Sequence, residues 1–204
     1  MSDYVITIAR TFGSGGRTIG IMLSEALGIP YYDKDLIRLA SDESGINESL
    51  FGMNDEYAKK TIFKKPPAYD GTVLPPDDPD FTSAKNLFNF QAKTIEKLAD
   101  KESCIIIGRC ADHVLKDRKN VLRVFIWADR AHCIENVMRI NSVVDKKEAV
   151  KQIERIDKER STYYKNYTGH SWDDVRNYDL CLNTGDLGFE RCVDIISYCA
   201  KLLK

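Results

Sequence analysis

Near its N-terminus the chain reads Val5-Ile-Thr-Ile-Ala-Arg-Thr-Phe-Gly-Ser-Gly-Gly-Arg-Thr18. The apolar, β-branched residues 5–8 predict a short buried strand. Apolar residues then recur at helical spacing over residues 19–27, and Gly28 stands where a helix commonly ends. A glycine-rich loop therefore joins a predicted strand to a predicted helix, which is the context in which such a loop binds phosphate.

The loop supplies the groups that hold a polyphosphate. Glycine tolerates a positive φ and lets the backbone approach a ligand closely, and successive N–H groups beside a helix N-terminus attract anions. Arg17 stands where the P-loop pattern has Lys, and Thr18 carries the hydroxyl that usually ligates Mg²⁺. The nucleotide-binding residues that we predict are Phe12, Gly13, Ser14, Gly15, Gly16, Arg17 and Thr18. The alternative is a turn without a ligand, because Thr11 occupies the position of the first P-loop glycine.

The composition is that of an ordinary globular domain. The 204 residues include 30 basic and 31 acidic ones, which gives a net charge of −1, so no basic field favours nucleic acid. No apolar run approaches the roughly 20 residues that span a bilayer, and the N-terminus lacks the pattern of a signal peptide. The six cysteines form no C-x-x-C pair and the three histidines are scattered, which disfavours a zinc site. We expect a reduced, cytoplasmic protein of one domain, residues 1–204, without nucleic-acid or membrane partners.

The rest of the chain alternates between strand-like and helix-like patterns. Further strands are expected at residues 29–33, 103–107, 121–126 and 177–183, with amphipathic helices between and after them. This alternation predicts an α/β fold with a parallel sheet. Residues 41–80 break the pattern with polar residues and prolines, and predict a mobile loop. Its lysines, which either close over an anionic substrate or are simply solvated, are Lys59, Lys60, Lys64 and Lys65.

Two polar residues directly follow predicted strands. Asp33 ends the second strand, and Arg109 comes after Gly108 at the end of the third. The carboxyl ends of parallel strands form the ligand crevice of open α/β sheets, so both residues are candidates for substrate binding. The alternatives are that Asp33 only caps the next helix and that Arg109 pairs with Asp112 at the rim of the sheet.

Four segments together resemble the cytidylate kinase-like family, a divergent branch near the nucleoside monophosphate kinases. They are residues 10–18, 31–37, 107–112 and 177–184, and they stand in the expected order over nearly the whole chain. The resemblance implies a P-loop kinase fold, with a five-stranded parallel sheet in the order 2-3-1-4-5 flanked by helices. It also implies a substrate-binding excursion within residues 41–100 and an arginine-rich lid within residues 139–170.

The same resemblance assigns roles to residues outside the loop. It implies acceptor-binding roles for Asp33, Arg109, Asp112 and Asp157, and catalytic roles for Arg155 and Arg160, with Arg139 as a further contributor. Arg17 of the loop is the third predicted catalytic residue, as the cation that stands in place of the P-loop Lys. Arg155 and Arg160 lie about 140° apart around a helix, so they do not share one face squarely. A surface ion pair between Arg155 and Glu159 is the alternative.

Phosphoryl transfer depends on positioned cations and on the exclusion of water, which an arginine-bearing lid provides. We therefore expect a phosphotransferase that uses ATP and Mg²⁺ and a small acceptor, in the first place a nucleoside monophosphate such as CMP. One alternative is a shikimate-type kinase that phosphorylates a small-metabolite hydroxyl oriented by Asp33. The other is a non-catalytic nucleotide sensor, which the absent P-loop Lys suggests.

Overall fold

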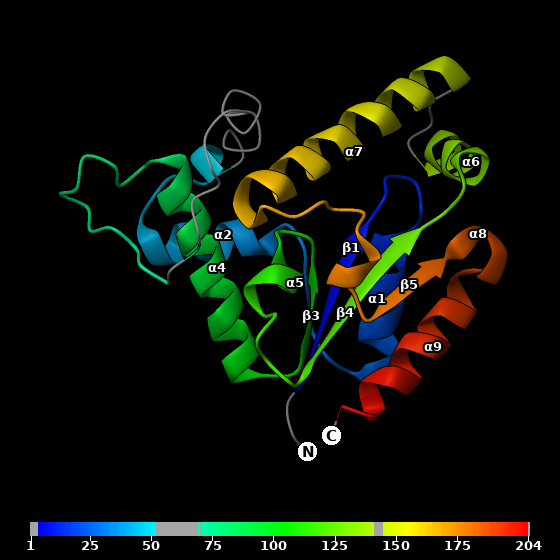
Figure 1. Cartoon of the computed structure of the whole chain (residues 1–204), viewed down its shortest axis with the longest axis horizontal. Coiled ribbons are helices and arrows are strands. Elements are labelled where there is room, and N and C mark those ends of the chain that lie inside the picture. The colour runs from blue at the N-terminus through cyan, green and yellow to red at the C-terminus, as the bar shows by residue number, and fades with distance from the viewer. Residues whose placement is uncertain (1–3, 52–68, 70, 141–144, 204) are drawn as a thin grey trace.

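The computed structural model describes residues 4–51, 69, 71–140 and 145–203. Five parallel strands form one sheet in the order β2-β3-β1-β4-β5 (Figure 1), as the family resemblance predicts. The strands are β1 (Val5–Arg10), β2 (Tyr31–Tyr32), β3 (Cys104–Ile107), β4 (Val121–Trp127) and β5 (Leu180–Asn183). The order places β1, and the loop that follows it, at the centre of the sheet.

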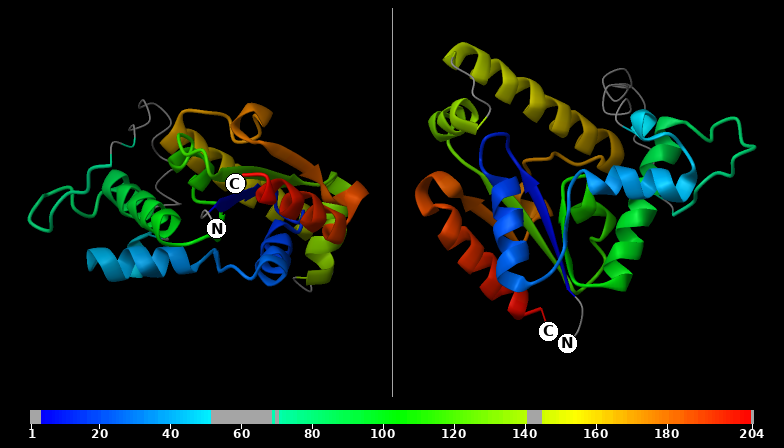
Figure 2. Two further views of the ribbon diagram at one scale, coloured as in Figure 1. Left: turned by 90° about the horizontal axis from the view of Figure 1, so that it is seen from below. Right: turned by 180° about the vertical axis from the view of Figure 1, so that it is seen from behind.

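Helices cover both faces of the sheet (Figure 2). Those described are α1 (Gly16–Leu27), α2 (Asp35–Ser44), α4 (Ala84–Lys101), α5 (Ala111–Val114), α6 (Arg130–Ile140), α7 (Lys146–Thr168), α8 (Thr184–Leu187) and α9 (Phe189–Lys201). Side chains alternate along a strand, so Ile6 and Ile8 pack with α1 and α9, whereas Val5 packs with α2, α4 and α5. Residues 104–107 are buried on both faces, which explains their uninterrupted apolar run.

The helix α7 crosses the carboxyl ends of the strands, whereas both ends of the chain lie at the opposite edge of the sheet (Figure 1). The side chain of Asp145 accepts a hydrogen bond from the Lys147 amide and begins this helix, and Gly169, with a φ of 76°, ends it. In the described part of the chain, no helix is long and apolar enough to cross a membrane.

The C-terminal part departs from the sequence prediction in two details. The strand expected over residues 177–183 begins only at Leu180, because residues 175–177 form a short 3₁₀ helix that Asp174 caps. A short helix, α8, precedes the closing helix that the sequence predicts over residues 187–203, which is α9. The two are separated at Gly188, whose φ of 76° and ψ of 168° do not continue a helix.

The predicted loop over residues 41–80 is anchored at both of its described ends. The helix α2 continues to Ser44, and beyond it the side chains of Ile46 and Phe51 are buried. On the other side, Asn86 of α4 accepts a hydrogen bond of 2.8 Å from the Leu74 amide. Lys59, Lys60, Lys64 and Lys65 lie outside the described residues, so both alternatives for them, contact with a substrate and simple solvation, stay open.

Candidate functional site

The β1–α1 loop has the tight backbone that the sequence predicts. Gly13 and Gly15 have φ values of 87° and 82°. A Cβ on Gly13 would lie 2.6 Å from the carbonyl oxygen of Cys133, so glycine is required there on both grounds. The Ser14 hydroxyl donates to the Thr11 carbonyl at 2.8 Å, and the Thr184 hydroxyl donates to the Ser14 carbonyl at the same distance. Neighbouring elements therefore hold the loop in place.

Most of the loop amides face no protein acceptor. The exceptions are the Phe12 amide, which donates to the Asp157 carboxylate at 2.7 Å, and the Ser14 amide, which donates to the Thr11 carbonyl at 3.5 Å. Within the described ranges, nothing accepts a hydrogen bond from the amides of Gly13, Gly15, Gly16, Arg17 or Thr18. Unpaired N–H groups at a helix N-terminus attract anions, so the loop is arranged to receive phosphate oxygens.

Arg17 and Thr18 follow this cluster of amides. The Arg17 side chain is 60% exposed, and its Nε lies 3.3 Å from Asp33 Oδ2. The Thr18 hydroxyl lies on the first turn of α1. Mg²⁺ in kinases is held mainly by substrate phosphates and water with one or two protein oxygens, and Thr18 fits that role. No three His, Cys, Asp or Glu side chains of the described chain gather to hold a metal by themselves.

A cavity of about 240 Å³ lies beside the loop, under α7. It opens at the carboxyl ends of β1, β2 and β3, where α/β proteins bind their ligands. Its lining combines three arginines, three carboxylates and three aromatic rings, namely Arg10, Arg109 and Arg160, Asp33, Asp112 and Glu159, and Tyr163, Tyr164 and Trp172. Guanidinium groups suit phosphate and carboxylate ligands, and the rings offer flat apolar surfaces.

Asp33 lies between the loop and the cavity. Besides Arg17, it receives a hydrogen bond of 3.5 Å from Arg10 Nη2. Among the described residues no amide of α2 donates to the Asp33 carboxylate, so Asp33 does more than cap this helix. The Asp33 carboxylate instead pairs with one arginine of the loop, Arg17, and with one arginine of the cavity, Arg10.

Arg109 reaches the cavity through an uncommon backbone. Gly108, Arg109 and Cys110 have consecutive φ values of 75°, 57° and 56°. Residues other than glycine rarely adopt a positive φ, and such strain is concentrated at functional sites. The guanidinium carbon of Arg109 lies 5.9 Å from the centre of the Tyr163 ring. Arg109, which the sequence predicts as a substrate-binding residue, thus lies in the lining of the cavity.

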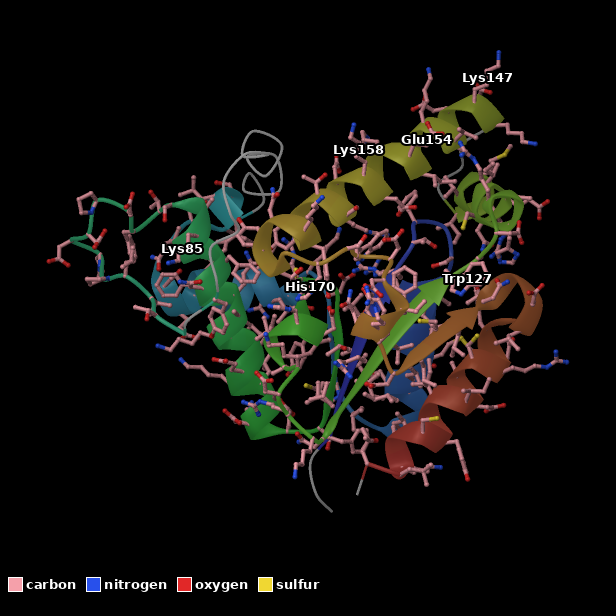
Figure 3. The ribbon with its side chains drawn as sticks, viewed as in Figure 1. Lys85, Trp127, Lys147, Glu154, Lys158 and His170 are labelled. Carbon is pink, nitrogen blue, oxygen red and sulfur yellow. The ribbon has the colours of Figure 1, made fainter. Side chains whose placement is uncertain are left out.

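The inner face of α7 supplies one wall of the site. Ile156, Glu159, Arg160 and Tyr163, which line the cavity, are spaced as one face of a helix. Arg160 Nη1 donates to the Arg10 carbonyl at 3.0 Å and lies 3.6 Å from Asp157 Oδ1. Lys147 and Lys158 point away from the sheet on the outer face (Figure 3).

The other predicted arginines of the lid region lie apart from this face. Arg155 is 62% exposed and its Nη1 lies 3.3 Å from Glu159 Oε1, which is the surface pair left open by the sequence. Arg139 is exposed and donates to Asn136, whose side-chain amide in turn donates to the Gly13 carbonyl. Of the three candidates, the structure brings only Arg160 into the cavity lining.

The sequence reasoning missed Arg10 and the aromatic residues of the cavity. Arg10 stands in the stretch of residues 5–18 that contains the glycine-rich loop. The one signal for it in the sequence was a charged residue at the end of a buried, apolar strand. Its side chain is 17% exposed. Burial, and the nearby charge of Arg160, lower the pKa of Arg10 to about 9, so it stays charged at neutral pH.

Asp112 lines the cavity and has 4% of its surface exposed. The Tyr164 hydroxyl donates to Asp112 Oδ2 at 2.6 Å. Burial raises the pKa of Asp112 to about 6, although the hydrogen bond from Tyr164 opposes this shift. The carboxyl group therefore changes charge near neutral pH, unlike an exposed aspartate.

This raised pKa predicts how Asp112→Asn changes stability with pH. The folded chain binds the Asp112 proton more tightly than the unfolded chain, so the stability from this group is complete below about pH 4 and is lost as the pH rises through about 6. Asn stays neutral, so the variant should gain up to about 3 kcal/mol over the wild type between pH 4 and pH 8. Urea unfolding at several pH values measures this gain, and a difference that does not change with pH contradicts the prediction.

Comparison with known proteins agrees with the fold and with the loop and cavity described above. The model of the cytidylate kinase-like family matches residues 5–186. A cytidylate kinase from Methanosarcina acetivorans is 25% identical over 198 residues, which cover 94% of this chain and 93% of that protein. A solved structure of an uncharacterized protein from Eubacterium ventriosum is 28% identical, with a TM-score of 0.71 over 98% of this chain and 99% of that one.

The fold is also that of P-loop kinases with other names. Shikimate kinase from Acinetobacter baumannii, solved in complex with shikimate, superposes with a TM-score of 0.52 at 11% identity, over 100% of this chain and 96% of that one. At this identity the likeness concerns the fold alone. Since the family match extends from β1 into α8, the chain belongs to the cytidylate kinase-like family and is a kinase with a P-loop fold.

Proposed function

We propose that the protein transfers the γ-phosphate of ATP to a nucleoside monophosphate, with CMP as the first candidate. The observation that carries this proposal is the adjacency of two unlike sites. An amide-rich loop suited to a donor polyphosphate lies beside a cavity lined by three arginines, and α7 contributes to both through Asp157 and Arg160. The curated relatives named cytidylate kinase support the choice of CMP.

The proposed roles follow from position. The loop amides and Arg17 hold the donor phosphates, and Thr18 would hold Mg²⁺, which supplies charge neutralisation when bound. Arg109, with Asp33 and Asp112, seats the acceptor. An acceptor phosphate oxygen attacks the γ-phosphorus, the bond from that phosphorus to the bridging oxygen breaks, and ADP leaves. Arg160 stabilises the charge on the oxygens of the migrating group.

Asp157 has a proposed part in closing the lid over the substrates. Its carboxylate accepts from the Phe12 amide and lies beside Arg160, so it ties α7 to the first residue of the loop. A lid held in this way excludes water, which would otherwise accept the phosphoryl group.

The exposed position of Arg155 predicts a ranking of the two lid arginines. Since Arg155 pairs with Glu159 outside the cavity, Arg155→Met should reduce turnover less than about tenfold, well below the loss expected for Arg160→Met. Steady-state ADP release from both variants measures the ranking. A larger loss for Arg155→Met would show that α7 turns or shifts when the substrates bind.

A shikimate-type acceptor is the second candidate, and the size of the cavity favours it. At about 240 Å³ the cavity is somewhat smaller than the roughly 300 Å³ of the smallest common ligand pockets. A compact hydroxyl acceptor would fit without further opening of α7, with Asp33 as the group that orients the hydroxyl.

One assay separates these functions. ADP release from ATP and Mg²⁺ is measured with CMP, dCMP and UMP, and in parallel with shikimate and gluconate. Stimulation by a nucleoside monophosphate supports the proposal, whereas stimulation only by a non-nucleotide acceptor supports the second candidate. If ATP raises the melting temperature but no acceptor yields ADP, the protein is a nucleotide sensor.

A further inference from the structure

Arg10 is a largely buried arginine that has no role in the proposed function described above. It ends β1, lines the cavity, and is 17% exposed. In the described part of the chain its guanidinium has one carboxylate within 4 Å, Asp33, at 3.5 Å, and Arg17 lies at 3.3 Å from the same carboxylate. An ion pair this long, in which the carboxylate is shared, compensates a buried guanidinium poorly.

The backbone opposite Arg10 is shaped around it. A Cβ on Gly108 would lie 2.2 Å from Arg10 Nη1, so a side chain there would displace the guanidinium. The same glycine begins the run of three positive φ values that ends at Cys110. This strained path leaves room for Arg10, and strain of this kind is maintained where function needs it.

Arg10 also stands where the donor and acceptor regions meet. A Cβ on Gly16 would lie 2.6 Å from the Arg10 Cβ, so Arg10 touches the first residue of α1. Its carbonyl accepts the hydrogen bond from Arg160 on the other side. Arg160, Arg109 and Arg17 carry the same positive charge and repel that of Arg10, so positive charge is in excess around this guanidinium.

We propose that Arg10 is a substrate-binding residue whose guanidinium holds a phosphate group at the floor of the cavity, beside Arg160. The proposal rests on the proposed function, in which the acceptor carries that phosphate. Arginine can bind two phosphate oxygens at once through its planar fork, and it is the residue suited to a partly buried anion. In this role Arg10 provides a cation that is held in place by its surroundings, whereas the cation of the neighbouring loop, Arg17, is exposed to solvent.

The test uses inorganic phosphate as the probe, with the donor loop already filled by ADP and Mg²⁺. The melting temperature of the wild type should rise with phosphate concentration. Arg10→Met should raise the apparent Kd for phosphate at least about tenfold, and Arg10→Lys, which keeps the charge without the fork, at least about threefold. Lys158→Met, which removes a cation from the outer face of α7, is the control and should bind phosphate as the wild type does.

A pair of glycine variants tests the same idea without changing any charge. Gly108 and Gly45 have φ values of 75° and 70°, so alanine is strained at both, but nothing lies within 4 Å of a Cβ on Gly45. Gly108→Ala should weaken phosphate binding about as much as Arg10→Lys, because the new methyl group displaces Arg10. Gly45→Ala should lower the melting temperature and leave the Kd unchanged.

Two results would overturn the proposal. One is a wild type whose melting temperature does not respond to phosphate in the presence of ADP. The other is an equal Kd for phosphate in the wild type, Arg10→Lys and Gly108→Ala, which would assign Arg10 a structural role only. If Arg10→Met does not fold, Arg10→Lys and Gly108→Ala still decide the question. The proposed function fails separately, since phosphate binding through Arg10 does not require that any acceptor be phosphorylated.

Discussion

Arg160→Met is expected to reduce kcat about 10²- to 10³-fold while leaving the protein folded. Arg160 lines the cavity from α7, is 25% exposed, and already donates to the Arg10 carbonyl beside the loop. A guanidinium at this place meets the charge that develops on the migrating phosphoryl group, so its loss acts on the transition state more than on substrate binding. Steady-state kinetics, with kcat and KM determined for both substrates, measure this effect.

Lys158→Met is the matched control, because Lys158 lies on the same helix and points away from the sheet (Figure 3). It removes the same charge from α7 and should leave kcat within about twofold, as for surface substitutions generally. Arg160→Lys should recover part of the loss, since it keeps the charge without the planar fork. If Arg160→Met and Lys158→Met have equal kcat values, Arg160 has no catalytic role.

Arg17→Ala is expected to lose most turnover, about 10²-fold or more, with almost no change in stability. The side chain is 60% exposed and its described ion pair is the one with Asp33, so folding depends little on it. In the proposed function the same guanidinium neutralises the donor phosphates, in place of the Lys of the usual pattern. A coupled assay of ADP release and a thermal melt of the same sample give both values.

Arg17→Lys is the informative companion of this variant. It restores the residue of the common P-loop pattern, so it should retain far more activity than Arg17→Ala if a point charge is sufficient. Unchanged activity in Arg17→Ala would remove Arg17 from the mechanism. A large drop in melting temperature would instead show that its pair with Asp33 is structural.

The parts of the site that could be predicted from the sequence are those whose residues lie next to each other in the chain. The β1–α1 loop was predictable because strand, glycines and helix are contiguous, and its positive φ values at Gly13 and Gly15 follow from that pattern. Asp33 and Arg109 were predictable because each directly follows a strand, and parallel strands bring such positions to one edge. The order of the strands was known only through the family resemblance.

The parts that the sequence did not predict depend on contacts between distant segments. Arg10 matters because Asp33, Gly108 and Arg160 surround it, and no pattern within β1 reveals these neighbours. For α7, helical geometry indicated that Arg155 and Arg160 do not share one face squarely. It did not reveal which of them faces the cavity, because the placement of the helix on the sheet decides that.

The central claim is that the free amides of the β1–α1 loop bind the phosphates of a nucleotide. The most direct measurement is a titration of ¹⁵N-labelled protein with ADP and Mg²⁺, followed through the amide resonances. The predicted result is that the largest shifts occur at Gly13, Gly15, Gly16, Arg17 and Thr18, whose amides face no acceptor among the described residues. Binding of ADP that leaves these resonances unchanged, or no binding at all, would contradict the account.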